Sequence, residues 1–166
     1  MGDESKRPKL SEAVKYFKQV YDNVGKSVPE AGKFIGGKVN YNVNLIADDD
    51  LKWKNLCAVR LSYVLNKTGF KIPRLGAKTV SGGNGNWYLY RVKDMIKYLT
   101  STFGEPDVSY IAPTAGKLST QKGIILFEVD GWQDATGHAT IWDGIGCSDS
   151  CYFDNAKKAH LWILED

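Results

Sequence analysis

With 166 residues, of which 43% are hydrophobic and 25% charged, the chain is long enough and apolar enough to fold around one hydrophobic core. Its net charge of +3, with no basic run longer than Lys157-Lys158, argues against a nucleic-acid partner, and no apolar stretch is long enough for membrane insertion. The polar residues 1–9 lack the apolar core of a signal peptide, so we expect a disordered leader followed by a single domain over residues 10–166.

Apolar residues at helical spacing dominate the first part of the chain. The spacing predicts helices over residues 10–24, 28–35, 56–68 and 89–103, each of which ends at or next to a glycine. Pro29 is placed for the first turn of the second helix, and Asn55 is placed to cap the third. The polar segments 39–54 and 71–86 predict irregular loops.

The pattern changes to strands after Pro106. Short apolar runs separated by turn residues predict strands over residues 108–111, 123–129, 139–142 and 161–164. Helices followed by strands are typical of an α+β fold, so we expect the N-terminal helices to pack on an antiparallel sheet.

Cys57 lies where the third predicted helix begins. If Asn55 caps that helix, Cys57 occupies its first turn, where unpaired N–H groups and the helix dipole favour a negative charge. This position promotes the thiolate, the attacking form of cysteine, and the same amides would stabilise an oxyanion. The alternative interpretation is a small thiol buried in the core.

His138 opens a predicted strand directly after a turn, where an imidazole would overhang a cleft. A histidine in that place would take a proton from Cys57 and later hand it to the leaving amine. The alternative is a histidine that merely starts a strand. His160 is the other histidine, and its position beside Lys158 predicts a surface residue.

Three cysteines, Cys57, Cys147 and Cys151, suggest one disulfide and one free thiol. Cys147 and Cys151 are close enough in sequence to pair if the turn between them is tight, and Cys57 would then be the reactive thiol. A disulfide needs an oxidising compartment, which points to export by a dedicated machine. The competing interpretation is a zinc site of Cys147, Cys151 and His160, for which no fourth ligand stands out.

A Cys–His pair needs a third group to orient the imidazole, and Asp149 lies in the loop that such a disulfide would hold rigidly. A turn aspartate is the alternative role for Asp149. Asp143 and Asp154 are rival candidates for the third group.

Three further residues are candidates for substrate binding. Arg60 follows Cys57 by one helical turn and would meet a substrate carboxylate, although a structural ion pair is the commoner role. Trp87 and Tyr88 follow a glycine-rich loop and would line a cleft, with burial of Trp87 in the core as the alternative. The glycine-rich run itself lacks the Lys-Ser/Thr ending of a phosphate-binding loop.

Four motifs together resemble one known family. They are Asn-x-Cys-Ala-x-Arg-x-Ser-Tyr-x-Leu-Asn from Asn55, Gly-Asn-Trp-Tyr-Leu-Tyr-Arg-Val from Gly85, Gly-His-Ala-Thr-Ile-Trp-Asp-Gly from Gly137 and Cys-Ser-Asp-Ser-Cys from Cys147. Their order and spacing are similar to those of the type VI secretion amidase effectors of family four, over nearly the whole chain after the leader.

The resemblance implies a papain-like fold of the NlpC/P60 type, with Cys57 as nucleophile, His138 as base, Asp149 as orienting residue, and a disulfide between Cys147 and Cys151. It implies a peptidoglycan amidase that cuts the bond between D-glutamate and meso-diaminopimelate in the stem peptide, with no cofactor or metal. It also implies delivery by the type VI secretion machinery into the periplasm of a target bacterium, and a cognate immunity protein that blocks the site.

Two other functions are compatible with these residues. A papain-like acyltransferase would use the same Cys–His pair, and a non-catalytic wall-binding module would keep Cys57 as a structural thiol. Analysis of the products separates the first from a hydrolase, and the rate of Cys57 alkylation at mildly acidic pH separates the second.

Overall fold

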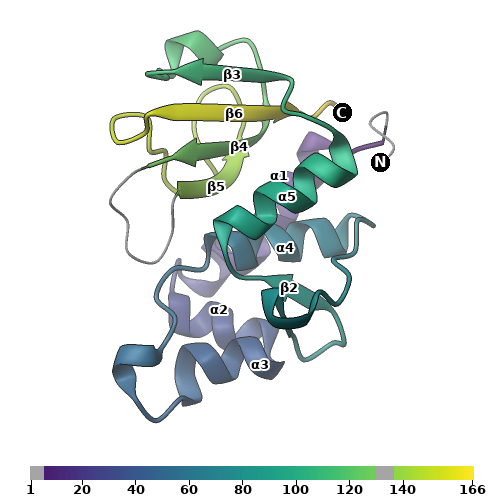
Figure 1. The fold of residues 1–166 in the computed structure, drawn as a ribbon, viewed down its shortest axis with the longest axis vertical. Coiled ribbons are helices and arrows are strands. Elements are labelled where there is room, and N and C mark those ends of the chain that lie inside the picture. The colour runs from purple at the N-terminus through teal and green to yellow at the C-terminus, as the bar shows by residue number, and fades with distance from the viewer. Residues whose placement is uncertain (1–5, 130–136) are drawn as a thin grey trace.

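The N-terminal half of the chain is helical, as the spacing of its apolar residues predicts. The structure is a computed structural model that describes residues 6–129 and 137–166. Its α-helices are α1 (Leu10–Val20), α2 (Val28–Ile35), α3 (Gly37–Asn40), α4 (Cys57–Lys67) and α5 (Val92–Phe103). Figure 1 shows α4 in the middle of the molecule, between the end that carries the main sheet and the end that carries α2 and α3. None of the helices in the described ranges is long and apolar enough to cross a membrane.

The C-terminal half supplies an antiparallel sheet, which within the described residues has four strands in the order β3-β6-β4-β5. Their bounds are β3 (Val108–Ile111), β4 (Gly123–Glu128), β5 (Gly137–Trp142) and β6 (Lys158–Ile163). One face, which includes Leu126 and Ala139, packs on α1, α4 and α5 in the main core. The other face, which includes Phe127 and Trp142, forms a separate cluster with the C-terminal loops. The predicted α+β class is therefore confirmed.

A short hairpin that the sequence pattern does not predict lies beside α4. Its strands, β1 (Thr79–Ser81) and β2 (Trp87–Leu89), pair antiparallel, so the loop expected there is partly strand. Leu89, the predicted start of the fourth helix, ends β2 instead, because the Ser62 Oγ accepts its N–H at 3.0 Å. Helix α5 consequently begins only at Val92.

Helix α4 is the central element because the neighbouring elements enclose it. Asn55 Oδ1 accepts the Cys57 N–H at 3.0 Å, but the N-cap residue is Leu56, whose side chain makes no capping hydrogen bond, so the cap predicted at Asn55 is one residue early. Every residue from Cys57 to Asn66 is buried, and Gly69 follows the helix with a left-handed φ of 94°. The helix contacts α1, α5, β2 and β5, so its first residue faces the strand that carries the predicted histidine.

Two helical segments differ from the prediction. Helix α1 stops at Val20, and a 3₁₀ turn at Asp22–Val24 replaces its expected last turn. The segment 39–54, expected to be irregular, continues α3 into a π-helical turn at Tyr41–Leu45. The Asn44 side chain explains this turn, because its amide donates two hydrogen bonds, of 2.7 and 2.9 Å, to neighbouring polar groups. Such bonds leave no trace in the spacing of apolar residues.

The ordered fold begins before the predicted boundary at residue 10. Residues 1–5 of the predicted leader lie outside the described residues. Arg7, however, donates hydrogen bonds to the carbonyl oxygens of Phe103 at 2.9 Å and Ile163 at 3.0 Å, and Pro8 is buried. The segment just before α1 is therefore fixed against α5 and β6.

Candidate active site

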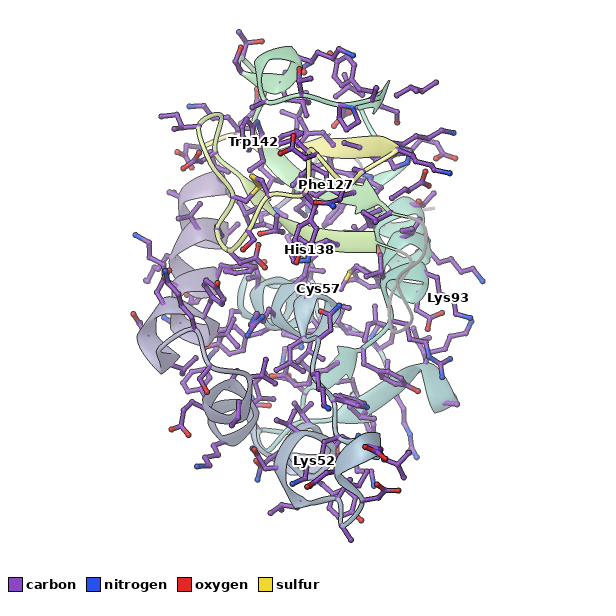
Figure 2. The ribbon with its side chains drawn as sticks, turned by 90° about the vertical axis from the view of Figure 1, so that its left-hand side faces the viewer. Lys52, Cys57, Lys93, Phe127, His138 and Trp142 are labelled. Atoms are coloured by element: carbon purple, nitrogen blue, oxygen red, sulfur yellow. A yellow bond between two sulfur atoms is a disulfide. The ribbon has the colours of Figure 1, made fainter. Side chains whose placement is uncertain are left out.

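Cys57 is the first residue of α4, near the middle of the face shown in Figure 2. It is the free cysteine of the described residues, and it is only 2% exposed. The residue belongs to the main core cluster, together with Leu61 of its own helix and Ala139 of β5. The helix start thus holds the thiol in a fixed place against the sheet.

His138 is the second residue of β5, and Figure 2 shows it directly beside Cys57. Its Nε2 lies 3.0 Å from Asp149 Oδ1, and Cys57 is close enough to help raise the pKa of the imidazole. Because Asp149 occupies Nε2, Nδ1 is the ring nitrogen left for the thiol. The Tyr152 ring lies against the imidazole with centroids 4.3 Å apart, a neighbour that the sequence analysis missed. The structure therefore brings the three residues of the predicted triad together.

The carboxylate that contacts His138 comes from a loop closed by a disulfide. Cys147 and Cys151 are bonded, with Cα atoms 5.4 Å apart, which confirms the predicted pairing. Asp149 lies between them, and its side chain is 5% exposed. A hydrogen bond of 2.9 Å from the Ser148 N–H to a carbonyl of β5 ties the loop to the strand that carries the histidine. The alternative zinc site is wrong, because the two sulfur atoms are bonded to each other.

The two rival aspartates have other positions. Asp143 Oδ1 accepts the N–H groups of Ile145 and Gly146, at 2.8 and 2.7 Å, and closes a turn. The hydrogen bond from Gly146 is the main reason that the pKa of Asp143 lies below its usual value. Asp154 is exposed. Neither has the buried contact with the imidazole that Asp149 has.

His160 forms a separate polar row across three strands. Its Nδ1 is 2.7 Å from Ser109 Oγ, and its Nε2 is 3.3 Å from Glu128 Oε1. The His160 side chain is 20% exposed, so it is more enclosed than the predicted surface residue. Within residues 6–129 and 137–166, no cluster of three or more His, Cys, Asp or Glu side chains is arranged to hold a metal ion.

Two opposing effects set the charge of His138. Burial is the largest single effect and lowers its pKa, but the hydrogen bonds to Asp149 and Cys57 and the charges of these residues together outweigh burial. The result is a pKa raised from 6.5 to about 9. The imidazole is therefore protonated near neutral pH, and its positive charge lies next to Cys57.

The folded protein should lose stability as the pH rises from 6.5 toward about 9. A histidine with a pKa raised by folding adds stability that is fully present below pH 6.5 and is lost as the pH rises through about 9. We expect the melting temperature of the parent protein, followed by circular dichroism, to fall over this range. The melting temperature of His138→Ala should fall much less, and an equal decline in both proteins would contradict the buried ion pair.

Arg60 lies inside the protein behind the triad rather than on a substrate-facing surface. The residue is 6% exposed, and its guanidinium lies 4.9 Å from the centroid of the Tyr21 ring. Among the described residues, its Nε and Nη2 have no hydrogen-bond partner. Burial lowers the pKa of Arg60, and the charges of Asp149, Tyr21 and Cys57 act against that effect. A contact with a substrate carboxylate would require this buried side chain to move.

Trp87 and Tyr88 point to opposite sides of β2, as successive strand residues do. Trp87 packs on the cluster that contains Cys57, and the Arg74 guanidinium lies 5.0 Å from the centroid of its ring. Tyr88 is 1% exposed in a second cluster with Ile35, and burial raises its pKa to about 12. Tyr88 therefore fills the core and is not available for a contact with substrate. Of the two residues, only the partly buried Trp87 keeps exposed surface for such a contact.

Reducing the disulfide should lower activity more than it lowers the melting temperature. The bond between Cys147 and Cys151 closes a very short loop, so its contribution to global stability is expected to stay below the ~3 kcal/mol of a fifteen-residue loop. Its local effect is larger, because it fixes Asp149 against His138. We expect a several-fold loss of activity after reduction, measured beside the shift in melting temperature. Unchanged activity in fully reduced protein would remove the disulfide from any role at the site.

Known proteins resemble the chain over most of its length. The family described as Type VI secretion system (T6SS), amidase effector protein 4 (Tae4) matches residues 53–162. Tae4 from Salmonella typhimurium, solved with the immunity Tai4 from Enterobacter cloacae, is 40% identical, with a TM-score of 0.84 over 95% of this chain and 99% of that one.

Two structures from Enterobacter cloacae are similarly close. Tae4 in its effector–immunity complex with Tai4 is 39% identical, with a TM-score of 0.84 over 96% of this chain and 100% of that one. Tae4 by itself is 39% identical, with a TM-score of 0.84 over 99% and 100% of the two chains. Among curated proteins there is no match.

Proposed function

The chain belongs to the Tae4 family of type VI secretion amidase effectors, and we propose that it is a cysteine amidase with Cys57 as nucleophile, His138 as proton carrier and Asp149 as orienting residue. Membership makes it an antibacterial amidase effector directed at peptidoglycan. The observation that carries the cysteine mechanism is the double contact of His138, with Asp149 on one side and Cys57 on the other. A papain-like arrangement of the NlpC/P60 type is part of this proposal.

The proposed reaction has two stages. The Cys57 thiolate attacks the carbonyl carbon of the scissile amide, and the His138 imidazolium gives its proton to the leaving amine, which leaves an acyl thioester on sulfur. Water then attacks the thioester while His138 takes one proton from the water. The thiolate leaves, and the carboxylic acid that forms gives its proton to the solvent. Asp149 stabilises the imidazolium of the first stage and fixes the ring so that Nδ1 faces the sulfur.

The substrate bond of the proposal is the amide between the D-glutamyl side-chain carbonyl and the amine of meso-diaminopimelate. The site of action of the proposal is the periplasm of a target cell, reached through the type VI secretion machinery. An oxidising periplasm would preserve the disulfide next to Asp149, which supports this location. The Tae4 proteins of Salmonella and Enterobacter are bound by Tai4 immunity proteins, so we infer a cognate immunity protein for this chain as well.

Mass spectrometry of purified peptidoglycan digested by the protein tests this function. We expect new free D-glutamyl carboxyl groups and new diaminopimelate amino groups, with the glycan strands intact. Release of disaccharides, or of whole stem peptides from muramic acid, would place the enzyme in another class. Transfer of the glutamyl group to an added amine in preference to water would make it an acyltransferase.

A further inference from the structure

A cavity of about 430 Å³ lies next to the start of α4. Its walls come from the segment before the helix and from the residues between β2 and α5, namely Asp50, Leu51, Lys52, Trp53, Lys54, Asn55, Tyr90 and Arg91. Cys57 is not one of the lining residues, but Asn55 is, and the Asn55 side chain accepts the Cys57 N–H at 3.0 Å. Figure 2 shows Lys52 near the lower end of the molecule, below Cys57 and His138.

The apolar part of the cavity is rigid. The rings of Trp53 and Tyr90 are stacked, with centroids 4.8 Å apart and planes inclined by 24°. The Trp53 N–H donates to the Asn42 carbonyl at 2.9 Å, and the Tyr90 hydroxyl donates to the Ala77 carbonyl. These two anchors hold a flat aromatic surface against which the uncharged part of a ligand would pack.

The charged part of the cavity is positive. Lys52, Lys54 and Arg91 contribute three cations against the single carboxylate of Asp50. Lys52 is already paired with an aspartate at 2.9 Å, so it adds little. Lys54 and Arg91 are exposed, and within the part of the chain that the structure describes neither forms an ion pair. The Arg91 guanidinium lies over the Tyr90 ring at 5.1 Å from its centroid, at the border between the aromatic surface and solvent.

We propose that this cavity binds the stem peptide next to the scissile bond, and that Arg91 and Lys54 bind the free α-carboxylate of the D-glutamyl residue. The inference rests on the proposed function. A glutamyl residue linked through its side chain keeps its α-carboxylate only a few bonds from the reacting carbonyl, and the cavity reaches Asn55, two residues before Cys57. Exposed cations at the edge of an aromatic surface match an acid group followed by uncharged peptide. Arg91 and Lys54 are binding residues that set specificity, not catalytic ones.

Peptide binding in the Cys57→Ala background, measured by isothermal titration, tests this inference without cleavage. One stem peptide carries the free α-carboxylate, and a second carries a carboxamide in its place. Arg91→Gln should weaken binding of the carboxylate peptide by roughly fivefold, with a smaller effect of Lys54→Gln, and should leave the carboxamide peptide unaffected. Lys93→Gln is the matched control, because Lys93 is also an exposed cation near the start of α5 but lies outside the cavity.

Equal effects of Arg91→Gln and Lys93→Gln, or equal losses for the two peptides, would overturn the inference. Wall cleavage by the parent protein is measured in parallel. If the parent cleaves the wall and Arg91→Gln binds the carboxylate peptide normally, the subsite is wrong and the proposed function stands. If the parent cleaves no wall peptide, the proposed function fails and the subsite falls with it.

Discussion

Replacing Cys57 with Ala should slow the release of wall peptides by at least about 10⁴-fold, because in the proposed mechanism the sulfur forms the covalent intermediate. The protein should stay folded. The residue is 2% exposed in the core, and removing one sulfur atom from such a place costs on the order of 1 kcal/mol. The rate is measured from the soluble muropeptides that the parent and the variant release from the same purified wall.

Thermal unfolding of the variant is the control for this loss, since only a folded variant makes the comparison meaningful. A shift of a few degrees in melting temperature is compatible with the small cavity that the substitution leaves. Activity of Cys57→Ala within about tenfold of the parent, that is, within about 1.4 kcal/mol of its barrier, would remove Cys57 from the mechanism.

Replacing His138 with Ala should cost nearly as much activity as replacing Cys57. In the proposed mechanism His138 carries the proton that the leaving amine needs, so the first stage of the reaction fails without it. Because residues that act as one unit are strongly non-additive, the double variant should be little slower than either single variant. Rates are compared by single-turnover digestion of the same wall preparation.

Two independent losses that multiply in the double variant would contradict a shared catalytic unit. The two substitutions lie in different elements, α4 and β5, so the thermal unfolding of each single variant is compared with that of the other. At about pH 6 both should melt as single transitions, as expected for a small cooperative domain.

The long elements of the fold are predictable because their apolar residues repeat at regular intervals over many positions. The strand at Gly123–Glu128 and the helix that ends at Phe103 are of this kind. The hairpin of β1 and β2 is not, because each strand has three residues and the Leu89 backbone is held by Ser62 from a distant helix. Tertiary contacts decide such short segments, and local sequence does not contain them.

The residues of the proposed triad could be predicted from the sequence, but the way they lie relative to one another could not. Asn55 before Cys57 is a local signal for a helix start, and its side chain accepts the Cys57 N–H, although the N-cap residue is Leu56. The contact between His138 and Asp149 depends on how β5 and the disulfide loop return to α4, which no local pattern states. Tyr152 beside the imidazole was missed for the same reason, since an aromatic residue in a loop has no spacing that identifies its partner.

The polar residues around the site show the same limit. From the sequence, Arg60 is a charged residue on the predicted helix. Its burial could not be predicted from the sequence. Trp53, in the segment before α4, and Tyr90, between β2 and α5, line the same cavity and stack on each other. The cavity therefore exists only in the folded chain. The family resemblance implies the roles of the three proposed triad residues. The residues that pack around them can be identified only from the structure.

Digestion of purified peptidoglycan in water enriched in oxygen-18, with the parent protein and Cys57→Ala side by side, tests hydrolysis by Cys57 most directly. We expect the parent to introduce one heavy oxygen atom into each newly formed glutamyl carboxyl group, because water hydrolyses the thioester. We expect Cys57→Ala to form no such product. Labelled products from Cys57→Ala at the parent's rate, or cleavage by the parent without incorporation of the heavy oxygen, would contradict hydrolysis by Cys57.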